Sequence, residues 1–221
     1  MRRLSGFLIA VVFLSVFTTA TAAQEDEWQN KWYWGAQAGV FLYSPLVATG
    51  ESSMQSAWEV GGHWLITRER VGFHLALAQV LYGNDATASI ADGTVVGQTI
   101  SFTTGQRLQA ELYAIPLDGK LQVYAGGGFL INHVTDAVPV GTFATPQLAQ
   151  SIQQEIDDLS TKAFFTISGG VQYRMGRLAV FGTYQFIPEG RDFLIASTQH
   201  AITGGLRYAL TASNQDVTTD R

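Results

Sequence analysis

Six ionisable side chains, spread over five segments of alternating apolar and polar residues, are the first candidates for chemistry. They are Glu59, His63, His74, Glu111, Arg174 and Arg207. Such groups exchange protons, bind metals or form ion pairs. All six fall on the more polar face of their segments, where an isolated buried charge would be very costly. The pattern therefore predicts an internal network in which Glu59 and Glu111 pair with Arg207 and Arg107.

Metal-binding and phosphate-binding patterns are weak in this chain. The four histidines are dispersed, and His63 and His74 belong to different segments, so no metal site is predicted. The glycine runs 126–128 and 169–170 lack the Lys-Ser/Thr pair and the following helix of a phosphate loop. We therefore expect neither a metal nor a cofactor.

An enzyme that trims or transfers lipid acyl chains needs a serine or acid close to a histidine. His133 and His200 lie near the ends of their segments, and Ser168 and Ser197 are the nearest serines in sequence. No His-x-Ser motif of the kind found in lipid A deacylases is present. The sequence thus predicts no catalytic residue.

Alternation with a period of two residues identifies eight strand candidates, because successive side chains on a strand point to opposite faces. The clearest is 178–187, whose even positions are apolar or aromatic whereas Thr183 and Gln185 are polar. The others are 32–43, 55–66, 71–82, 99–116, 121–133, 163–174 and 199–210. A twelve-residue strand tilted near 45° covers about 28 Å, which is enough to cross a membrane.

The connections between these strands alternate between short and long. Short turns at 67–70, 117–120 and 175–177 separate longer connections at 44–54, 83–98, 134–162 and 188–198. This asymmetry is typical of outer-membrane barrels, whose short turns are periplasmic. The predicted fold is all-β: an eight-stranded antiparallel up-and-down transmembrane β-barrel.

One segment of the third long connection breaks the period. Thr145 is a suitable N-cap, Pro146 fits the first turn, and apolar residues follow at helical spacing up to Leu159. We expect a short amphipathic helix over 145–159 in the third outer loop. It either folds over the barrel mouth or contacts a partner or lipopolysaccharide.

The two ends of the chain define the remaining segments. Residues 1–23 have the charged start, short apolar stretch and small-residue end of a cleaved export signal. Residues 24–31 would form an N-terminal periplasmic segment, 32–210 the barrel and 211–221 a disordered periplasmic tail. The absence of cysteine excludes disulfides and a lipid-modified N-terminal cysteine. Without the signal, 11 basic residues face 18 acidic ones; this net charge of −7 argues against a nucleic-acid partner.

Aromatic residues near the strand ends indicate which face meets lipid, because Trp and Tyr favour the two interfaces of a bilayer. Tyr184 and Phe186, together with Leu42, are expected near the outer interface. The periplasmic girdle is expected to contain Trp32, Trp34, Trp64, Tyr173 and Tyr208. The opposite faces are too polar for the apolar cavity of a soluble ligand-carrying barrel. We therefore expect lipid outside and a polar, packed interior.

The segment Thr203-Gly-Gly-Leu-Arg-Tyr-Ala-Leu210 resembles the C-terminal assembly signal of outer-membrane barrels. Its matching positions are Thr203, Gly205, Tyr208 and Leu210. With Tyr113-Ala-Ile-Pro-Leu117 and Tyr124-Ala-Gly-Gly-Gly128, it is similar to the porin-like family typified by OmpA- and OmpX-type domains. The resemblance covers 32–210, although eleven residues follow Leu210 where the signal normally ends the chain.

This resemblance implies a bacterial outer-membrane location and a set of partners. These are outer-membrane lipids and lipopolysaccharide, the barrel-assembly machinery and periplasmic chaperones, with the protein itself a monomer. The expected role is structural, in envelope integrity or in surface interaction, with a plugged interior. The alternatives are a narrow passive channel and, less in keeping with the motifs, a lipid-modifying enzyme.

Overall fold

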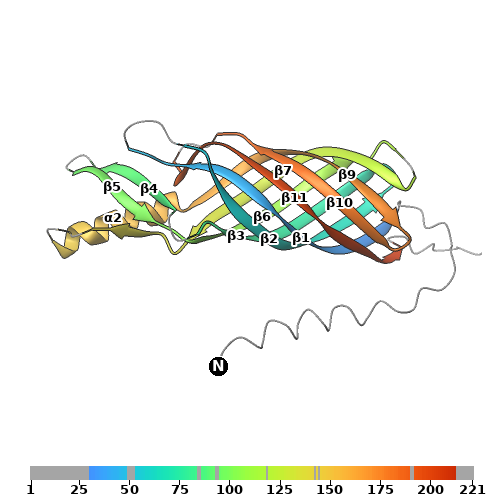
Figure 1. The fold of residues 1–221 in the computed structure, drawn as a ribbon, viewed down its shortest axis with the longest axis horizontal. Helices are drawn as coiled ribbons and strands as arrows, with labels where there is room; N and C mark the ends of the chain where they lie inside the picture. Colours follow the sequence, from blue (N-terminus) through green and yellow to red (C-terminus); the bar gives the residue numbers. More distant parts are fainter. Residues whose placement is uncertain are drawn as a thin grey trace, which may run out of the picture.

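Eight strands close into an antiparallel barrel, in the spatial order β1-β11-β10-β9-β7-β6-β3-β2 (Figure 1). The structure is a computed structural model that describes residues 30–48, 53–83, 86–92, 95–117, 119–141, 143, 145–189 and 192–212. The barrel strands are β1 Lys31–Pro45, β2 Gln55–Arg68, β3 Val71–Leu81, β6 Thr104–Ala114, β7 Leu121–Thr135, β9 Thr161–Met175, β10 Leu178–Ile187 and β11 Ile195–Ala212. The predicted eight-stranded antiparallel barrel is confirmed.

Burial alternates along the barrel strands as the period-two pattern requires. On β2, for example, Trp58 and Val60 are exposed on the outside whereas Glu59 is buried inside. The same alternation places Phe129 outside and Leu130 inside on β7. The sequence pattern therefore assigned most side chains to the correct side of the wall.

Three short turns join the strands at one end of the barrel, here called the short-turn end. Gly119 and Gly176 have φ angles of 126° and 66° in two of them, a conformation that glycine adopts without strain. The third turn places Glu69 at a φ of 47° instead. The opposite end, called the long-loop end, carries the longer connections (Figure 1).

The predicted fourth strand, 99–116, is wrong in its first five residues, 99–103. Residues up to Ser101 belong to β5 (Val95–Ser101), which pairs with β4 (Thr87–Asp92) and β8 (Val138–Val140) in a separate three-stranded sheet. The barrel strand β6 starts only at Thr104. The second and third long connections are thus partly built of strands. The Asp92-Gly93 dipeptide between two β-forming segments is the hairpin signal that identifies β4 and β5.

The predicted helix in the third long connection is confirmed as α2, Pro146–Leu159. Thr145 caps it by accepting a hydrogen bond from the Leu148 backbone N–H at 3.3 Å. Ile152 and Ile156 form its buried face. We call β4, β5, β8 and α2 together the head, which extends beyond the barrel mouth in Figure 1. Within the described residues, no helix is long and apolar enough to cross a bilayer.

The outer limits of the barrel differ slightly from the predicted 32–210. β1 begins at Lys31, and β11 continues to Ala212, where it pairs with Lys31 across the closure of the barrel. The strand therefore includes the first two residues of the predicted tail 211–221. The export signal 1–23 lies outside the described residues, as do 24–29 and 213–221.

Candidate functional site

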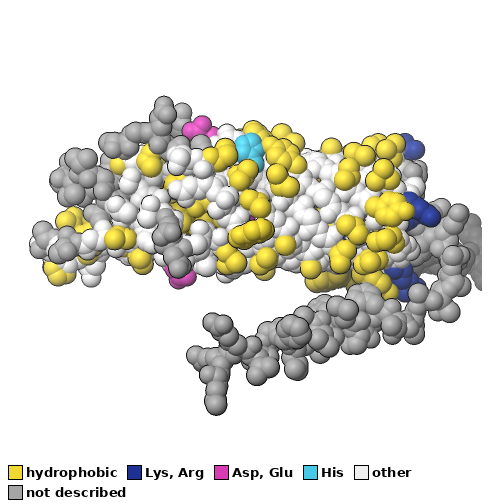
Figure 2. All heavy atoms as spheres, in the orientation of Figure 1, with side chains coloured by type: hydrophobic (Ala, Val, Ile, Leu, Met, Phe, Trp, Pro, Cys, Tyr) yellow, Lys and Arg dark blue, Asp and Glu magenta, His cyan; other side chains and the backbone are white. Residues whose placement is uncertain are grey.

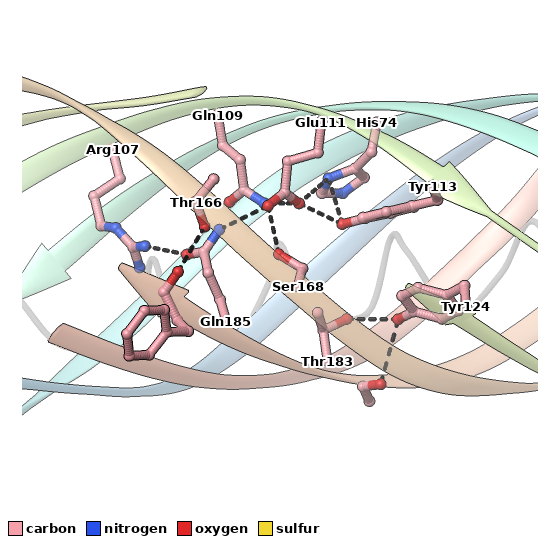
Figure 3. A network of polar contacts seen from close by, with 12 residues as sticks. His74, Arg107, Gln109, Glu111, Tyr113, Tyr124, Thr166, Ser168, Thr183 and Gln185 are labelled. Carbon is pink, nitrogen blue, oxygen red and sulfur yellow. Dashed lines mark hydrogen bonds and ion pairs between the residues drawn. The ribbon is translucent and has the colours of Figure 1, made fainter. Parts of the chain in front are cut away.

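A layer of polar side chains fills the middle of the barrel lumen. Strand β6 supplies four of them at alternate positions: Arg107, Gln109, Glu111 and Tyr113 (Figure 3). Alternate residues of one strand point to the same face, so these side chains form a row along the lumen. The neighbouring strand β3 adds His74, which lies directly opposite Glu111 in the register.

Glu59 pairs with Arg107, one of the two arginines predicted to neutralise the glutamates. The Arg107 guanidinium contacts the Glu59 carboxylate through Nη1 and donates through Nη2 to the Gln185 side-chain oxygen. Both charged residues are only 2% exposed. Burial costs a charged pair its hydration, and the direct contact with an opposite charge offsets that cost.

Glu111 is held by a set of neutral donors. Its Oε2 accepts hydrogen bonds from the Tyr113 hydroxyl at 2.6 Å and from the Gln109 side-chain amide. Its Oε1 accepts from the Ser168 hydroxyl and, at 3.2 Å, from the Gln185 amide. The His74 Nδ1 atom lies 3.7 Å from Oε2 and 3.1 Å from the Tyr113 hydroxyl. Hydrogen bonds to a charged group are the strong ones in proteins, so this shell stabilises the buried carboxylate.

Arg207 occupies a different part of the lumen, and the predicted pairing of Arg207 with the two glutamates is wrong. Its Nη1 donates to the Gln172 side-chain oxygen at 2.9 Å. Its guanidinium lies 3.9 Å from the centroid of the Phe181 ring and 5.8 Å from that of Tyr124. Arginine stacks readily on aromatic faces, and this contact takes the place of the expected carboxylate.

His63 and Arg174 were also assigned to the network. The structure buries His63 in the lumen, on the predicted inward side, but among the described residues neither side chain is hydrogen-bonded to the network. His63 is 2% exposed in the lumen, with its ring 4.9 Å from that of Phe181 and 5.4 Å from that of His74. Neither ring nitrogen has a hydrogen-bond partner among the described residues. Arg174 is partly exposed near the short-turn end.

A small cavity remains beside the network, between Gln37, Glu59, His74 and Thr203. Its volume is about 10 Å³, close to the space that one water molecule needs. The polar layer is therefore nearly filled by side chains, as expected for a barrel of eight strands.

Clusters of buried apolar and aromatic side chains lie on both sides of the polar layer, and the one towards the short-turn end shares the lumen with buried Arg207, Gln122 and Gln172. Towards the short-turn end, Tyr33, Leu65, Tyr113, Ile115, Tyr124 and Ala209 form one buried cluster. Towards the long-loop end, a larger cluster joins lumen residues such as Phe41, Val80 and Phe164 to Ile152 and Ile156 of α2. The sequence reading gave a polar interior throughout. The cluster towards the long-loop end was not predicted, because its residues lie at strand ends and in the head, where the alternation of apolar and polar residues cannot be interpreted.

The outer surface of the wall carries the residues assigned to the aromatic girdle. Near the short-turn end, Tyr208, Trp34 and Trp64 lie at one level across three adjacent strands. Trp64 stacks on Trp34 at 5.7 Å between ring centroids and meets the edge of Trp32 at 5.2 Å. Tyr173 is 47% exposed on the same outer surface.

Two more girdle residues lie closer to the long-loop end. Tyr184 donates to or accepts from His200 Nδ1 at 2.7 Å, and Phe186 meets the His200 ring edge-on. The Thr161 hydroxyl lies 2.7 Å from His133 Nδ1. Among the described residues no serine is hydrogen-bonded to a histidine. The Ser168 hydroxyl donates to Glu111 instead. The side chain of Ser197 is not described.

The residues that sequence reasoning omitted from the network are neutral: Gln109, Tyr113, Ser168 and Gln185. All four lie on the inward faces, so their positions in the alternating strand pattern could have identified them. The predicted network contained only charged side chains, whereas neutral donors supply most of the contacts to Glu111.

The fold is similar to those of known outer-membrane proteins. No protein-family model matches the sequence, and no curated protein matches it. The crystal structure of neisserial surface protein A (NspA) superposes with a TM-score of 0.54 at 12% identity, over 81% of this chain and 97% of that one. Outer membrane protein OprG from Pseudomonas aeruginosa gives a TM-score of 0.50 at 11% identity, over 83% and 98%. The chain is thus a closed eight-stranded β-barrel of the architecture found in these outer-membrane proteins.

Proposed function

We propose that this protein spans the bacterial outer membrane as a sealed, non-enzymatic barrel with a structural or surface-interaction role. The observation that carries the proposal is the inverted distribution of side chains. Large apolar residues such as Phe129 and Trp58 are 68% and 64% exposed on the wall, whereas Glu59 and Glu111 are buried inside. Figure 2 shows hydrophobic side chains gathered over the barrel wall. A water-soluble protein rarely exposes so continuous an apolar surface, which a bilayer would cover.

The dimensions of the strands agree with a membrane-spanning role. The shortest barrel strand, β10, has 10 residues, and transmembrane strands need about 9–11 residues. Closure of the sheet leaves no strand edge facing lipid, where an unpaired backbone group would be costly. In this proposal the short-turn end is periplasmic, the head lies outside the cell, and residues 1–23 direct export.

The layered lumen supports a sealed barrel over a channel. A permeating ion would have to pass two apolar clusters and the tightly bonded polar layer between them. An apolar constriction opposes ion passage because it offers no replacement for hydration. A bilayer recording should therefore give no steady conductance, and a regular step conductance would favour the narrow channel instead.

A surface role is supported by the head. Its helix α2 is anchored by Ile152 and Ile156 and turns polar residues, including Glu155 and Asp158, to the solvent. Such a packed extension presents a defined surface, which suits contact with partners outside the cell. A catalytic role lacks a comparable basis, since the described serines and histidines are not paired with each other.

Fractionation with a folding assay tests the proposal directly. The full chain, expressed in a Gram-negative host, should be recovered in the outer membrane. An unboiled sample should migrate faster than a boiled one on a denaturing gel, because closed membrane barrels resist unfolding by detergent. Recovery in a soluble fraction, or the same migration with and without boiling, would overturn the proposal.

A further inference from the structure

The charged side chains on the outside of the molecule are divided between its two ends. Arg68, Arg70, Lys120 and Arg177 are exposed around the short-turn end, and we call these four residues the basic ring. The exposed acids Asp136, Glu155, Asp157, Asp158, Glu189 and Asp192 lie at the long-loop end. Figure 2 shows Lys and Arg gathered at one extremity and Asp and Glu towards the other. The wall between them carries mainly apolar side chains.

Among the described residues, no acid is paired with a member of the basic ring. Glu69, between Arg68 and Arg70, is the one acidic residue of the described short turns; Asp118 belongs to another of these turns but lies outside the described residues. The ring therefore presents several cations without fixed counter-charges.

The position of the basic ring follows from the strand register. Arg177 directly precedes Leu178, which pairs with the girdle residue Tyr208. Lys120 directly precedes Leu121, which pairs with the girdle residue Tyr173. The cations thus lie one step beyond the aromatic girdle. In a bilayer, the layer just beyond an aromatic girdle contains the lipid headgroups.

We propose that the basic ring binds anionic phospholipids in the adjoining leaflet through their phosphate groups, and prefers them to zwitterionic lipids because no headgroup ammonium cancels their negative charge. The inference rests on the proposed membrane-spanning function. Arginine presents a fork of N–H donors that matches two phosphate oxygens, and three of the four members are arginines. Long basic side chains also reach a headgroup while their stems remain against apolar surface.

Native tryptophan fluorescence offers a test, because Trp32, Trp34 and Trp64 lie next to the basic ring. Trp58 is exposed nearer the other end, and Trp28 lies outside the described residues. The assay therefore uses the full chain carrying Trp28→Phe and Trp58→Phe, which leaves Trp32, Trp34 and Trp64 as the reporters. The protein is folded into vesicles of phosphatidylcholine and phosphatidylglycerol in a fixed ratio. In the first set of vesicles only the phosphatidylglycerol is brominated. In the second set the phosphatidylglycerol is unmodified, and an equal molar amount of the phosphatidylcholine is brominated instead. The ratio of the two quenching values measures the local enrichment of the anionic lipid.

We expect brominated phosphatidylglycerol to quench at least about twice as strongly, since one basic side chain near an anionic surface favours it about fivefold. The combined variant Arg68→Gln, Arg70→Gln and Arg177→Gln should bring the ratio close to one. Lys162→Gln removes a positive charge at the long-loop end and should leave the ratio unchanged. Glu69→Gln should raise it. High salt should lower the wild-type ratio because ions screen exposed charges.

Two results would overturn the inference. One is equal quenching by both lipids in a wild-type protein that is inserted and still migrates faster when unboiled; the proposed function would then stand. The other is a preference that persists in the triple variant. If the protein inserts into no vesicle, the proposed function itself fails, and the inference fails with it.

Discussion

The Glu111 carboxylate connects several strands of the barrel through the lumen. Its carboxylate contacts side chains from β6, β9 and β10, with His74 of β3 close by. Parity along the strands placed Glu111 inside but could not select its partners. Partners across a lumen depend on strand tilt and stagger, which a period-two pattern does not contain. The error in assigning Arg207 has this origin.

The Glu111→Gln substitution tests the network. It keeps the shape of the side chain but replaces an acceptor oxygen with an NH₂ group that faces donors such as the Tyr113 hydroxyl and the Gln109 amide. We expect a loss of about 2–4 kcal/mol in the free energy of unfolding. Urea unfolding in lipid vesicles measures it, with the exposed Glu189→Gln as the control. Equal stability of both variants would contradict the role given to the network.

Gly128, opposite Glu111 on β7, provides a second test on the same layer. A Cβ atom at this position would meet the backbone carbonyl oxygen of Ala110, which cannot move without displacing β6. We expect Gly128→Ala to reduce the yield of folded barrel and to lower its unfolding temperature. In Gly182→Ala the new methyl group would find its nearest neighbour at 4.0 Å, so this control should fold normally. Similar behaviour of the two variants would argue against the close approach of β6 and β7.

Among the secondary-structure elements, the barrel strands and α2 were predicted. The β4–β5 hairpin also carries a local signal in Asp92-Gly93, whereas β8 does not. Long alternating segments and the Thr145-Pro146 start carry strong local signals. β8 has only three residues, Val138–Val140, and its place beside β5 depends on contacts between two different loops. The stretch 99–101 was joined to β6 because alternation continues across the break. The place of β8 in the head thus depends on tertiary packing rather than on local pattern.

The anchoring of α2 can be tested without disturbing the barrel. Ile156 is fully buried in the cluster that joins the helix to the barrel mouth. Ile156→Asp would place an unpaired charge there, so we expect the helix to detach. Limited proteolysis of the folded protein should then cut within 134–162 while the barrel still migrates as folded. Gln154→Asp puts the same residue on the exposed face of the helix and should stay resistant. Protection of the Ile156→Asp protein would contradict the packing of the head.

The whole molecule has an apolar outer wall, a largely filled lumen and two ends of opposite charge. The period-two pattern predicted the closed barrel and its inner and outer faces, because successive side chains along a strand point to opposite faces of the sheet. It could not predict the clusters of buried apolar and aromatic side chains on either side of the polar layer. Those clusters contain residues from many strands, so they exist only once the barrel has closed.

The central claim is that the wall meets lipid, with the head on one side of the membrane and the short turns on the other. The chain contains no cysteine, so in a single-cysteine variant any labelling of this protein by a thiol reagent occurs at the introduced residue. Suitable sites are Asp158 in the head, Glu69 in a short turn and Leu77 on the wall, where the leucine is 59% exposed. The measurement is the extent of labelling by a membrane-impermeant maleimide, before and after the outer membrane is permeabilised.

We expect Asp158→Cys to be labelled on intact cells and Glu69→Cys only after permeabilisation. Leu77→Cys should remain unlabelled until the protein is unfolded, because lipid covers the wall. Labelling of Leu77→Cys in the folded protein would mean that the wall faces water. Labelling of Glu69→Cys on intact cells, with Asp158→Cys protected, would reverse the orientation. Either result would contradict the account.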